Sequence, residues 1–181
     1  MGENMQADSF VEKLKHFYTS TFDLEDGLLL GGQAYDVYGH FNVDNSRYVL
    51  VKKAKLWEAN SQEHLFIRSW KKEEGPLTVE KLQELIRPLE EIAEPQYVRG
   101  GEKYPPKNHM YSFLTLVVVT DGKIDDETIH YARKYRFAKT YMFNLRGYLE
   151  TRLVLVSTHD HLVTTNQQGK ELKKAYLKLM A

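Results

Sequence analysis

The sequence predicts an α/β protein in which a single mixed sheet carries helices on both faces. Three observations predict this class. Apolar residues recur at helical spacing in four segments. Alternating or continuous apolar runs lie between those segments, as strands require. From residue 76 onward, strand and helix patterns alternate, which favours parallel pairing. The predicted order is α-β-β-β-α-β-α-β-β-α, and 181 residues with a hydrophobic fraction of 42% fit a single domain over residues 1–181.

The first third is predicted to form one helix and three antiparallel strands. Asp8 or Ser9 is expected to cap a helix from Ser9 to about Thr19. A glycine-containing loop is expected at Leu28–Gly32, and Val43–Ser46 is expected to be a hairpin turn. The predicted strands of this meander are Ala34–Asn42, Arg47–Trp57 and Glu63–Trp70.

A second helix is predicted over about Val79–Ala93. Pro88 lies inside it and should kink it or divide it in two. Residues 95–109 are expected to form a long irregular connection. The predicted apolar stripe consists of Leu82, Leu85, Ile86, Leu89 and Ile92. The predicted solvent-facing side carries Glu80, Glu84, Glu90, Glu91 and Glu94.

The second half is predicted to alternate strands and helices. Met110–Thr120 is expected to be a buried strand, because Leu114–Val119 is an apolar run that only Thr115 interrupts. Asp125 is expected to cap a third helix that continues to Met142. The remaining predicted elements are a strand at Leu145–Ser157, a short strand at Leu162–Thr165 and a basic amphipathic helix at Gly169–Leu179.

Composition excludes several kinds of site. The chain contains no cysteine, which excludes disulfides, thiolate zinc sites, iron–sulfur clusters and thiol nucleophiles. It contains no phosphate-binding glycine loop, no Ser/His/Asp order and no metalloprotease helix motif. We therefore expect no cofactor and no bound metal, and the sequence does not decide whether the protein is an enzyme.

The N-terminus lacks the pattern of a signal peptide, and the longest apolar runs are far shorter than a membrane span. These observations predict a cytoplasmic protein without a membrane partner.

Charge is distributed unevenly along a chain whose net charge is zero. Residues 1–130 hold 15 Lys and Arg against 22 Asp and Glu, or −7, and residues 131–181 hold 10 against 3, or +7. This asymmetry favours an anionic ligand or nucleic acid as the partner of the C-terminal third. Alternatively, the two parts neutralise each other within the folded domain.

The stretch 131–152 mixes cations with aromatic rings, a combination that attracts phosphate and stacks on bases. On a helical wheel, Tyr131, Tyr135, Ala138 and Met142 share the expected core face. The outer face then presents Arg133 and Lys134 with aromatic rings between them, unless the sheet and the long loop cover both faces. The predicted residues for an anionic partner are Arg133, Lys134, Arg136, Phe137, Lys139, Tyr141 and Arg146.

The predicted element order resembles that of the restriction-endonuclease-like nucleases. That resemblance implies acidic residues on the hairpin strands that bind a divalent metal and activate water. The candidates are Asp44, Glu58, Glu63 and His64. The third predicted strand lacks the expected lysine two residues after Glu63, so the catalytic motif is missing. His159-Asp160-His161 is interpreted as a polar turn, because neighbouring side chains in a hairpin point to opposite sides.

A second resemblance covers most of the chain. It is carried by Trp57-Glu58, Glu63-His64-Leu65-Phe66, the segment from Arg136 to Phe143, Arg146-Gly147-Tyr148 and Thr165-Asn166-x-x-Gly169-Lys170. With these motifs the chain resembles an uncharacterised family of small bacterial proteins. The resemblance implies a bacterial cytoplasmic protein and adds no catalytic residue.

Three functions therefore remain open. The first is a non-enzymatic binding or regulatory module that holds an anionic partner with its basic, aromatic C-terminal third. The second is a metal-dependent nuclease-like enzyme, or a degenerate relative of one. The third is an interaction protein that forms a homo-oligomer through the Leu82–Ile92 stripe and the loop 95–109.

Overall fold

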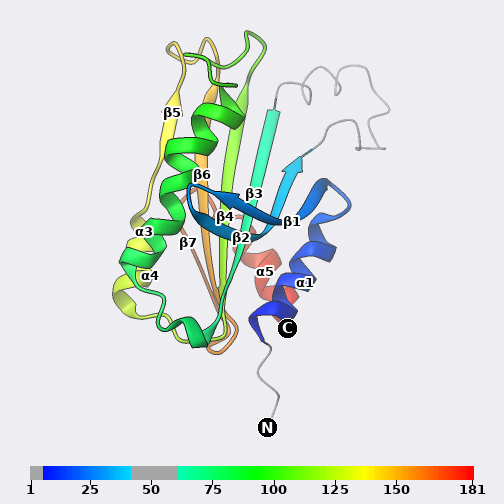
Figure 1. The fold of residues 1–181 in the computed structure, drawn as a ribbon, viewed down its shortest axis with the longest axis vertical. Helices are drawn as coiled ribbons and strands as arrows, with labels where there is room; N and C mark the ends of the chain where they lie inside the picture. Colours follow the sequence, from blue (N-terminus) through cyan, green and yellow to red (C-terminus); the bar gives the residue numbers. More distant parts are fainter. Residues whose placement is uncertain (1–5, 42–60) are drawn as a thin grey trace.

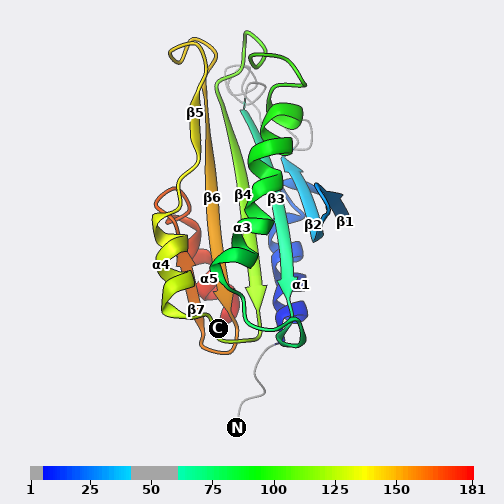
Figure 2. The ribbon, with the colours of Figure 1, turned by 60° about the vertical axis from the view of Figure 1, so that its left-hand side comes forward.

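A computed structural model of the chain describes residues 6–41 and 61–181 and consists of one mixed sheet between two layers of helices (Figure 1). Two helices, α3 and α4, cover one face, and α1 and α5 cover the other (Figure 2). The helices are α1 (Ala7–Tyr18), α3 (Val79–Pro88), α4 (Asp126–Lys134) and α5 (Leu172–Met180). The strands are β1 (Phe22–Leu30), β2 (Gln33–Phe41), β3 (Ser61–Trp70), β4 (Tyr111–Thr120), β5 (Ala138–Thr140), β6 (Tyr148–Ser157) and β7 (Leu162–Thr165). The predicted class, with helices on both faces, is confirmed.

Three parallel strands form the centre of the sheet, whose order is β1-β2-β3-β4-β6-β5, with β7 also paired to β6. The register aligns Ser61, Tyr111 and Tyr148 at one end of β3, β4 and β6, and Trp70, Thr120 and Ser157 at the other. The predicted apolar run of β4 is fully buried here, because helices cover both of its faces. Among the described residues, no helix is both long and apolar enough to cross a membrane.

The loop predicted at Leu28–Gly32 is wrong, because most of it belongs to a hairpin. β1 pairs antiparallel with β2, and Gly31 and Gly32 form the two-residue turn with φ of 56° and 79°. The acidic residues and Gly27 in β1 hide its alternation in the sequence. The predicted strand Arg47–Trp57 and the turn Val43–Ser46 lie outside the described residues.

Helix caps follow the prediction at α4 and differ at α1. The carboxylate of Asp125 accepts the amide of Thr128 at 2.7 Å, as predicted. At α1 the N-cap is Gln6, without a side-chain cap. The carboxylate of Asp8, one of the two expected caps, instead accepts the hydroxyl of Ser69 at 2.7 Å and pairs with Lys71 at 2.9 Å. Asp8 therefore binds residues distant in the sequence and does not cap the helix.

The second predicted helix is divided at Pro88, as expected. α3 ends there, and the π-helix η3 (Leu89–Val98) continues it. A π-helix has a wider turn, so its residues fall out of phase with an α-helical wheel. The amide of Arg99 accordingly bonds to the carbonyl of Glu94, five residues back, at 3.3 Å. Glu94, predicted to face solvent, is only 1% exposed.

The third helix ends at Lys134, eight residues before the predicted end at Met142. The chain turns extended at Tyr135 and then forms β5, which pairs with the first residues of β6. The wheel assignment past Tyr135 is therefore wrong, since Ala138 and Met142 are exposed and Tyr141 is buried.

The side chain of Asn166 closes the gap between β5 and β7 along β6. It accepts the amide of Leu153 at 3.0 Å and donates to the carbonyl of Thr151 at 2.8 Å, as a paired strand would. Buried backbone groups need such partners. Asn166 thus lets two short strands share one edge of β6.

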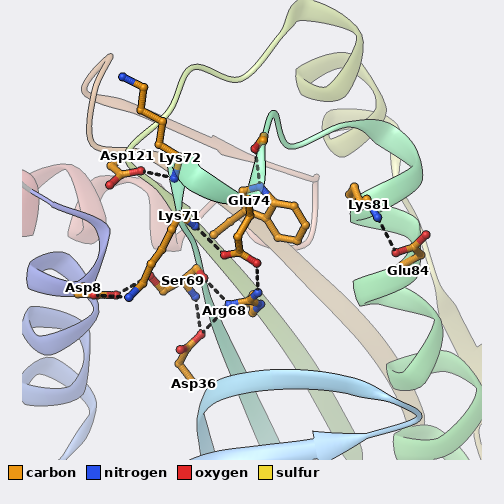
Figure 3. A network of polar contacts seen from close by, with 12 residues as sticks. Asp8, Asp36, Arg68, Ser69, Lys71, Lys72, Glu74, Lys81, Glu84 and Asp121 are labelled. Atoms are coloured by element: carbon orange, nitrogen blue, oxygen red, sulfur yellow. Dashed lines mark hydrogen bonds and ion pairs between the residues drawn. The ribbon is translucent and has the colours of Figure 1, made fainter.

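A polar network closes the end of the sheet where β3 and β4 finish (Figure 3). Asp36 accepts the amide of Ser69 at 2.7 Å and pairs with Arg68, whose other branch bonds to Glu74. Asp121 accepts the amide of Lys72 at 2.8 Å. These polar groups pair with one another, so we regard this end as structural.

Candidate anion-binding site at the amino ends of the parallel strands

Two loops meet at the opposite end of the sheet, where β4 and β6 begin (Figures 1 and 2). One is the apical loop, residues 99–110, between η3 and β4. The other is the hairpin tip, residues 141–147, between β5 and β6. The amide of Tyr148 donates to the carbonyl of Met110 at 3.1 Å, and Arg146 Nη1 donates to the carbonyl of Pro105 at 2.8 Å. Segments about forty residues apart in the sequence are therefore joined directly.

Gly147 makes this close approach feasible. Its φ is 76°, and a Cβ at this position would lie 2.2 Å from the carbonyl oxygen of Met110 and 2.8 Å from His109 Nδ1. Such distances exclude any side chain without movement of the backbone. The contact between the hairpin tip and the apical loop therefore depends on a glycine.

His109 fixes the same junction from below. Its Nδ1 lies 2.7 Å from the carbonyl oxygen of Arg146, which can only accept, so Nδ1 carries the proton and donates. Nε2 then accepts from the hydroxyl of Ser112 at 2.8 Å. Burial lowers the pKa of His109 more than the bond to the carbonyl raises it. The ring is therefore neutral at pH 7 and held in one tautomer.

A buried carboxylate, Glu94, braces both loops. Arg99 donates to it through Nε at 2.7 Å and Nη2 at 3.2 Å, Lys139 through Nζ at 3.0 Å, and Tyr141 through its hydroxyl at 2.8 Å. Burial raises the pKa of Glu94, but the bonds from Arg99, Tyr141 and Lys139 outweigh it, so the pKa lies below its ordinary value. Burial, and then the bond to Glu94, raise the pKa of Tyr141. Glu94 is thus ionised at pH 7 and links η3, the apical loop and β5.

Above this base lies a hollow of about 360 Å³, which we call the apical hollow. It is lined by Arg99, Glu102, Lys103, Tyr104, Pro105, Pro106 and Arg146. The lining holds three cations and one carboxylate, so its formal charge is +2. Glu94 and Lys139 lie beneath the hollow, and their opposite charges leave this sum unchanged. Arg146 leaves Nε and Nη2 without a hydrogen-bond partner among the described residues. The hollow therefore presents unused donors to an anion.

The hairpin tip exposes apolar side chains beside this hollow. Phe143 is 99% exposed and Leu145 is 75% exposed. Met142, Phe143 and Asn144 have φ of 49°, 54° and 71°, all in the left-handed region. That conformation costs roughly 1–2 kcal/mol for a residue other than glycine. Backbone strain of this kind is concentrated at functional sites.

The residues predicted for an anionic partner are divided among three places. Arg146 lines the apical hollow, while Lys139 and Tyr141 are bound to Glu94 beneath it. Phe137 is half-buried and packs against the core. Arg133, Lys134 and Arg136 are exposed at and just after the end of α4, away from the hollow. The predicted outer helix face with Arg133, Lys134, Phe137 and Tyr141 does not exist, because α4 ends at Lys134.

The structure also separates the predicted metal-binding residues. Glu63 and His64 are neighbours on β3 and face opposite sides of the sheet: Glu63 lies 3.6 Å from Arg152, and His64 Nδ1 lies 2.8 Å from the hydroxyl of Tyr38. They do not meet on one ion. Asp44 and Glu58 lie outside the described residues. Within residues 6–41 and 61–181 there is no group of three or more side chains suited to hold a metal.

The structure also places two other predicted features, the polar turn at His159-Asp160-His161 and the apolar stripe of the second predicted helix. His159 bonds to Asp160 at 2.8 Å in an exposed turn, in agreement with the polar turn expected there. The stripe proposed for an oligomer is occupied within the chain: Leu82, Leu85, Ile86 and Leu89 are buried in the core. That stripe is therefore not free for a second copy.

Sequence patterns missed Glu94, Arg99 and Lys103, which line and brace the apical hollow together with the predicted residues Arg146, Lys139 and Tyr141. Glu94 has the wrong helical phase, because the pattern does not reveal the π-helix. Arg99 and Lys103 belong to a segment whose composition predicts only a long loop. The one signal in the sequence was the length of that loop, since long loops in compact domains are often functional.

Comparison with known proteins agrees with the uncharacterised family expected from the motifs. No curated protein and no solved structure matches the chain. A family model described as "Domain of unknown function (DUF8052)" matches residues 6–178. The chain therefore belongs to the DUF8052 family, which has no assigned function.

Proposed function

We propose that this protein is a non-enzymatic binding module that holds an anionic partner in the apical hollow. The observation that carries the proposal is the convergence of Arg99, Lys103 and Arg146 on one hollow from segments far apart in the sequence. The positions of Arg99 and Arg146 are set before any ligand arrives, because Glu94 holds Arg99 and the carbonyl of Pro105 holds Arg146. Preorganised donors lose less entropy on binding.

Phosphate is the chemical group that best suits this hollow. The free side of the Arg146 guanidinium can donate in a planar fork that matches phosphate oxygens, and Lys103 adds a mobile point charge. Arg99 adds positive charge, since its nitrogens already donate to Glu94 and to the carbonyls of Glu102 and Lys103. Tyr104 and Phe143 place aromatic surface beside the cations. The local charge of +2 also explains how a chain of zero net charge binds a polyanion.

Binding of anionic probes at low salt tests the proposal. Inorganic tripolyphosphate is titrated by calorimetry, and a short fluorescent single-stranded oligonucleotide by polarisation. The logarithm of the oligonucleotide association constant should fall linearly with the logarithm of the salt concentration. If three cations each contact one phosphate, the slope should be about −2, since each contact contributes roughly −0.7 for a single strand.

Two matched variants localise the binding. Lys103→Glu reverses a charge in the hollow, and Lys134→Glu makes the same change at the exposed end of α4. Each unit charge contributes roughly 1 kcal/mol near 4 Å in water, so Lys103→Glu should weaken binding by about 2 kcal/mol, or thirtyfold. Lys134→Glu should leave affinity within about twofold. Equal losses in both variants, or no binding by the unmodified chain, would rule out the hollow as the site.

A further inference from the structure

The apolar hairpin tip and the cations around it carry an inference that rests on the proposed function and names the partner. Phe143 and Leu145 are 99% and 75% exposed, and Tyr104 of the apical loop and Met142 are also exposed. Both loops lie at the same end of the molecule (Figures 1 and 2). An exposed apolar patch of this kind marks a surface that binds an apolar phase or partner.

Three of the five cations at this end form no ion pair within the described part of the chain. Residues 99–110 and 138–148 contain five Lys and Arg and one acid, Glu102. Glu94 forms ion pairs with two of them, Arg99 and Lys139. Lys103, Lys107 and Arg146 form no ion pair with any residue of the described part of the chain. Three unpaired cations therefore lie in the two loops that also carry the exposed apolar side chains.

From this combination we infer that the apical end binds the surface of a membrane rich in anionic lipids. Phe143 and Leu145 enter the boundary between headgroups and acyl chains, and a lipid phosphate occupies the apical hollow beside Arg146 and Lys103. Aromatic and aliphatic side chains with flanking cations are typical of segments that lie in this interface. Juxtamembrane cations are attracted to the negative leaflet.

Two observations favour a lipid surface over a nucleic acid. Leu145 and Met142 offer no flat face for stacking on a base, yet both are exposed beside Phe143. The left-handed backbone of residues 142–144 presents Phe143 without support from neighbouring side chains, as insertion requires. The hydropathy of the sequence predicts no membrane partner, and none of the described helices could span a bilayer, but binding to a membrane surface requires no such helix.

Vesicle binding tests the inference directly. Cosedimentation is measured with vesicles of phosphatidylcholine alone and of phosphatidylcholine with phosphatidylserine. The chain should bind the mixed vesicles and be released by salt. Phe143→Ser and Leu145→Ser should each reduce the partition coefficient about tenfold, from the apolar surface removed. Leu29→Ser is the matched control, because Leu29 is 74% exposed in β1, and it should leave binding unchanged.

The depth of the hairpin tip gives an independent readout. Because the chain has no cysteine, Phe143→Cys carries a single environment-sensitive fluorophore, and Lys123→Cys carries it in the turn after β4, at the other end of the sheet. On addition of mixed vesicles, emission at position 143 should shift to the blue, and emission at 123 should stay constant. A partition coefficient that Phe143→Ser leaves unchanged, or a label at 143 that stays in water, overturns insertion.

The two proposals fail in different ways. Binding of tripolyphosphate and the oligonucleotide without binding of mixed vesicles overturns the membrane inference and leaves the hollow as an anion site. Binding of the oligonucleotide that is weakened by Phe143→Ser, with no vesicle binding, identifies nucleic acid as the partner. Binding of neither probe nor vesicles overturns both.

Discussion

Glu94 is predicted to be the main brace of the apical end, and replacing it by glutamine measures its contribution. The carboxylate accepts four hydrogen bonds, three of them from Arg99 and Lys139. A glutamine keeps one oxygen toward Arg99 Nε and Tyr141, and its amide then faces the nitrogens of Lys139 and Arg99 Nη2. Two charge-assisted bonds are lost, each about 1.5 kcal/mol at the low end of the usual range, because both cations are partly exposed.

Glu94→Gln should therefore lower the free energy of unfolding by about 3 kcal/mol, close to the roughly 3–5 kcal/mol lost when a buried ion pair is broken. Tyr141→Phe removes one donor from a carboxylate that keeps its cations and should lose only about 1 kcal/mol. Glu91→Gln makes the same chemical change at an exposed position of η3 and should change nothing. Urea denaturation of the four proteins measures these differences. The reasoning is refuted if Glu94→Gln loses no more than Tyr141→Phe.

Three further predictions concern the fold around the site. Asn166→Asp turns a donor toward the carbonyl of Thr151 into an acceptor and should lower the free energy of unfolding by about 2–3 kcal/mol, whereas the exposed Gln167→Glu should not; equal denaturation midpoints would contradict this. Gly147→Ala places a Cβ 2.2 Å from the carbonyl oxygen of Met110 and should lower both the melting temperature and the affinity for tripolyphosphate; an unchanged affinity would show that the junction does not shape the hollow. Burial, and then the nearby His40, lower the pKa of His64 to about 3. Since the unfolded chain binds this proton near pH 6.5, stability is full above that pH and should fall by about 2 kcal/mol by pH 5; His64→Phe should flatten this slope, and a slope unchanged by the substitution would contradict the assignment.

The central strands were predictable because the local sequence alone indicates that they are buried. Leu114–Val119 is apolar except for Thr115 and rich in valine, and such a run is typical of a strand covered on both faces. The cap at Asp125 and the division at Pro88 are likewise local effects. β5 was not predictable in this way, because a three-residue strand depends on its pairing with β6, and its sequence fits a helix equally well.

The apical hollow depends on contacts that no local pattern encodes. Arg146 was predicted as a cation of the site, but its neighbours Arg99 and Lys103 are about forty residues earlier in the chain. Glu94 was predicted on the wet side of a helix, and the π-helix rotates it inward. The uneven charge of the sequence predicts an anionic partner, and this stays a prediction; it indicated the end of α4 as strongly as the hairpin tip.

The central claim is that anions bind between the apical loop and the hairpin tip. Titration of the ¹⁵N-labelled protein with tripolyphosphate, followed through backbone amide chemical shifts, tests it most directly. We predict that the largest shifts fall within residues 99–106 and 141–147, and that they disappear in Lys103→Glu but not in Lys134→Glu. Largest shifts at residues 133–136, or shifts spread evenly over the surface, would contradict the claim.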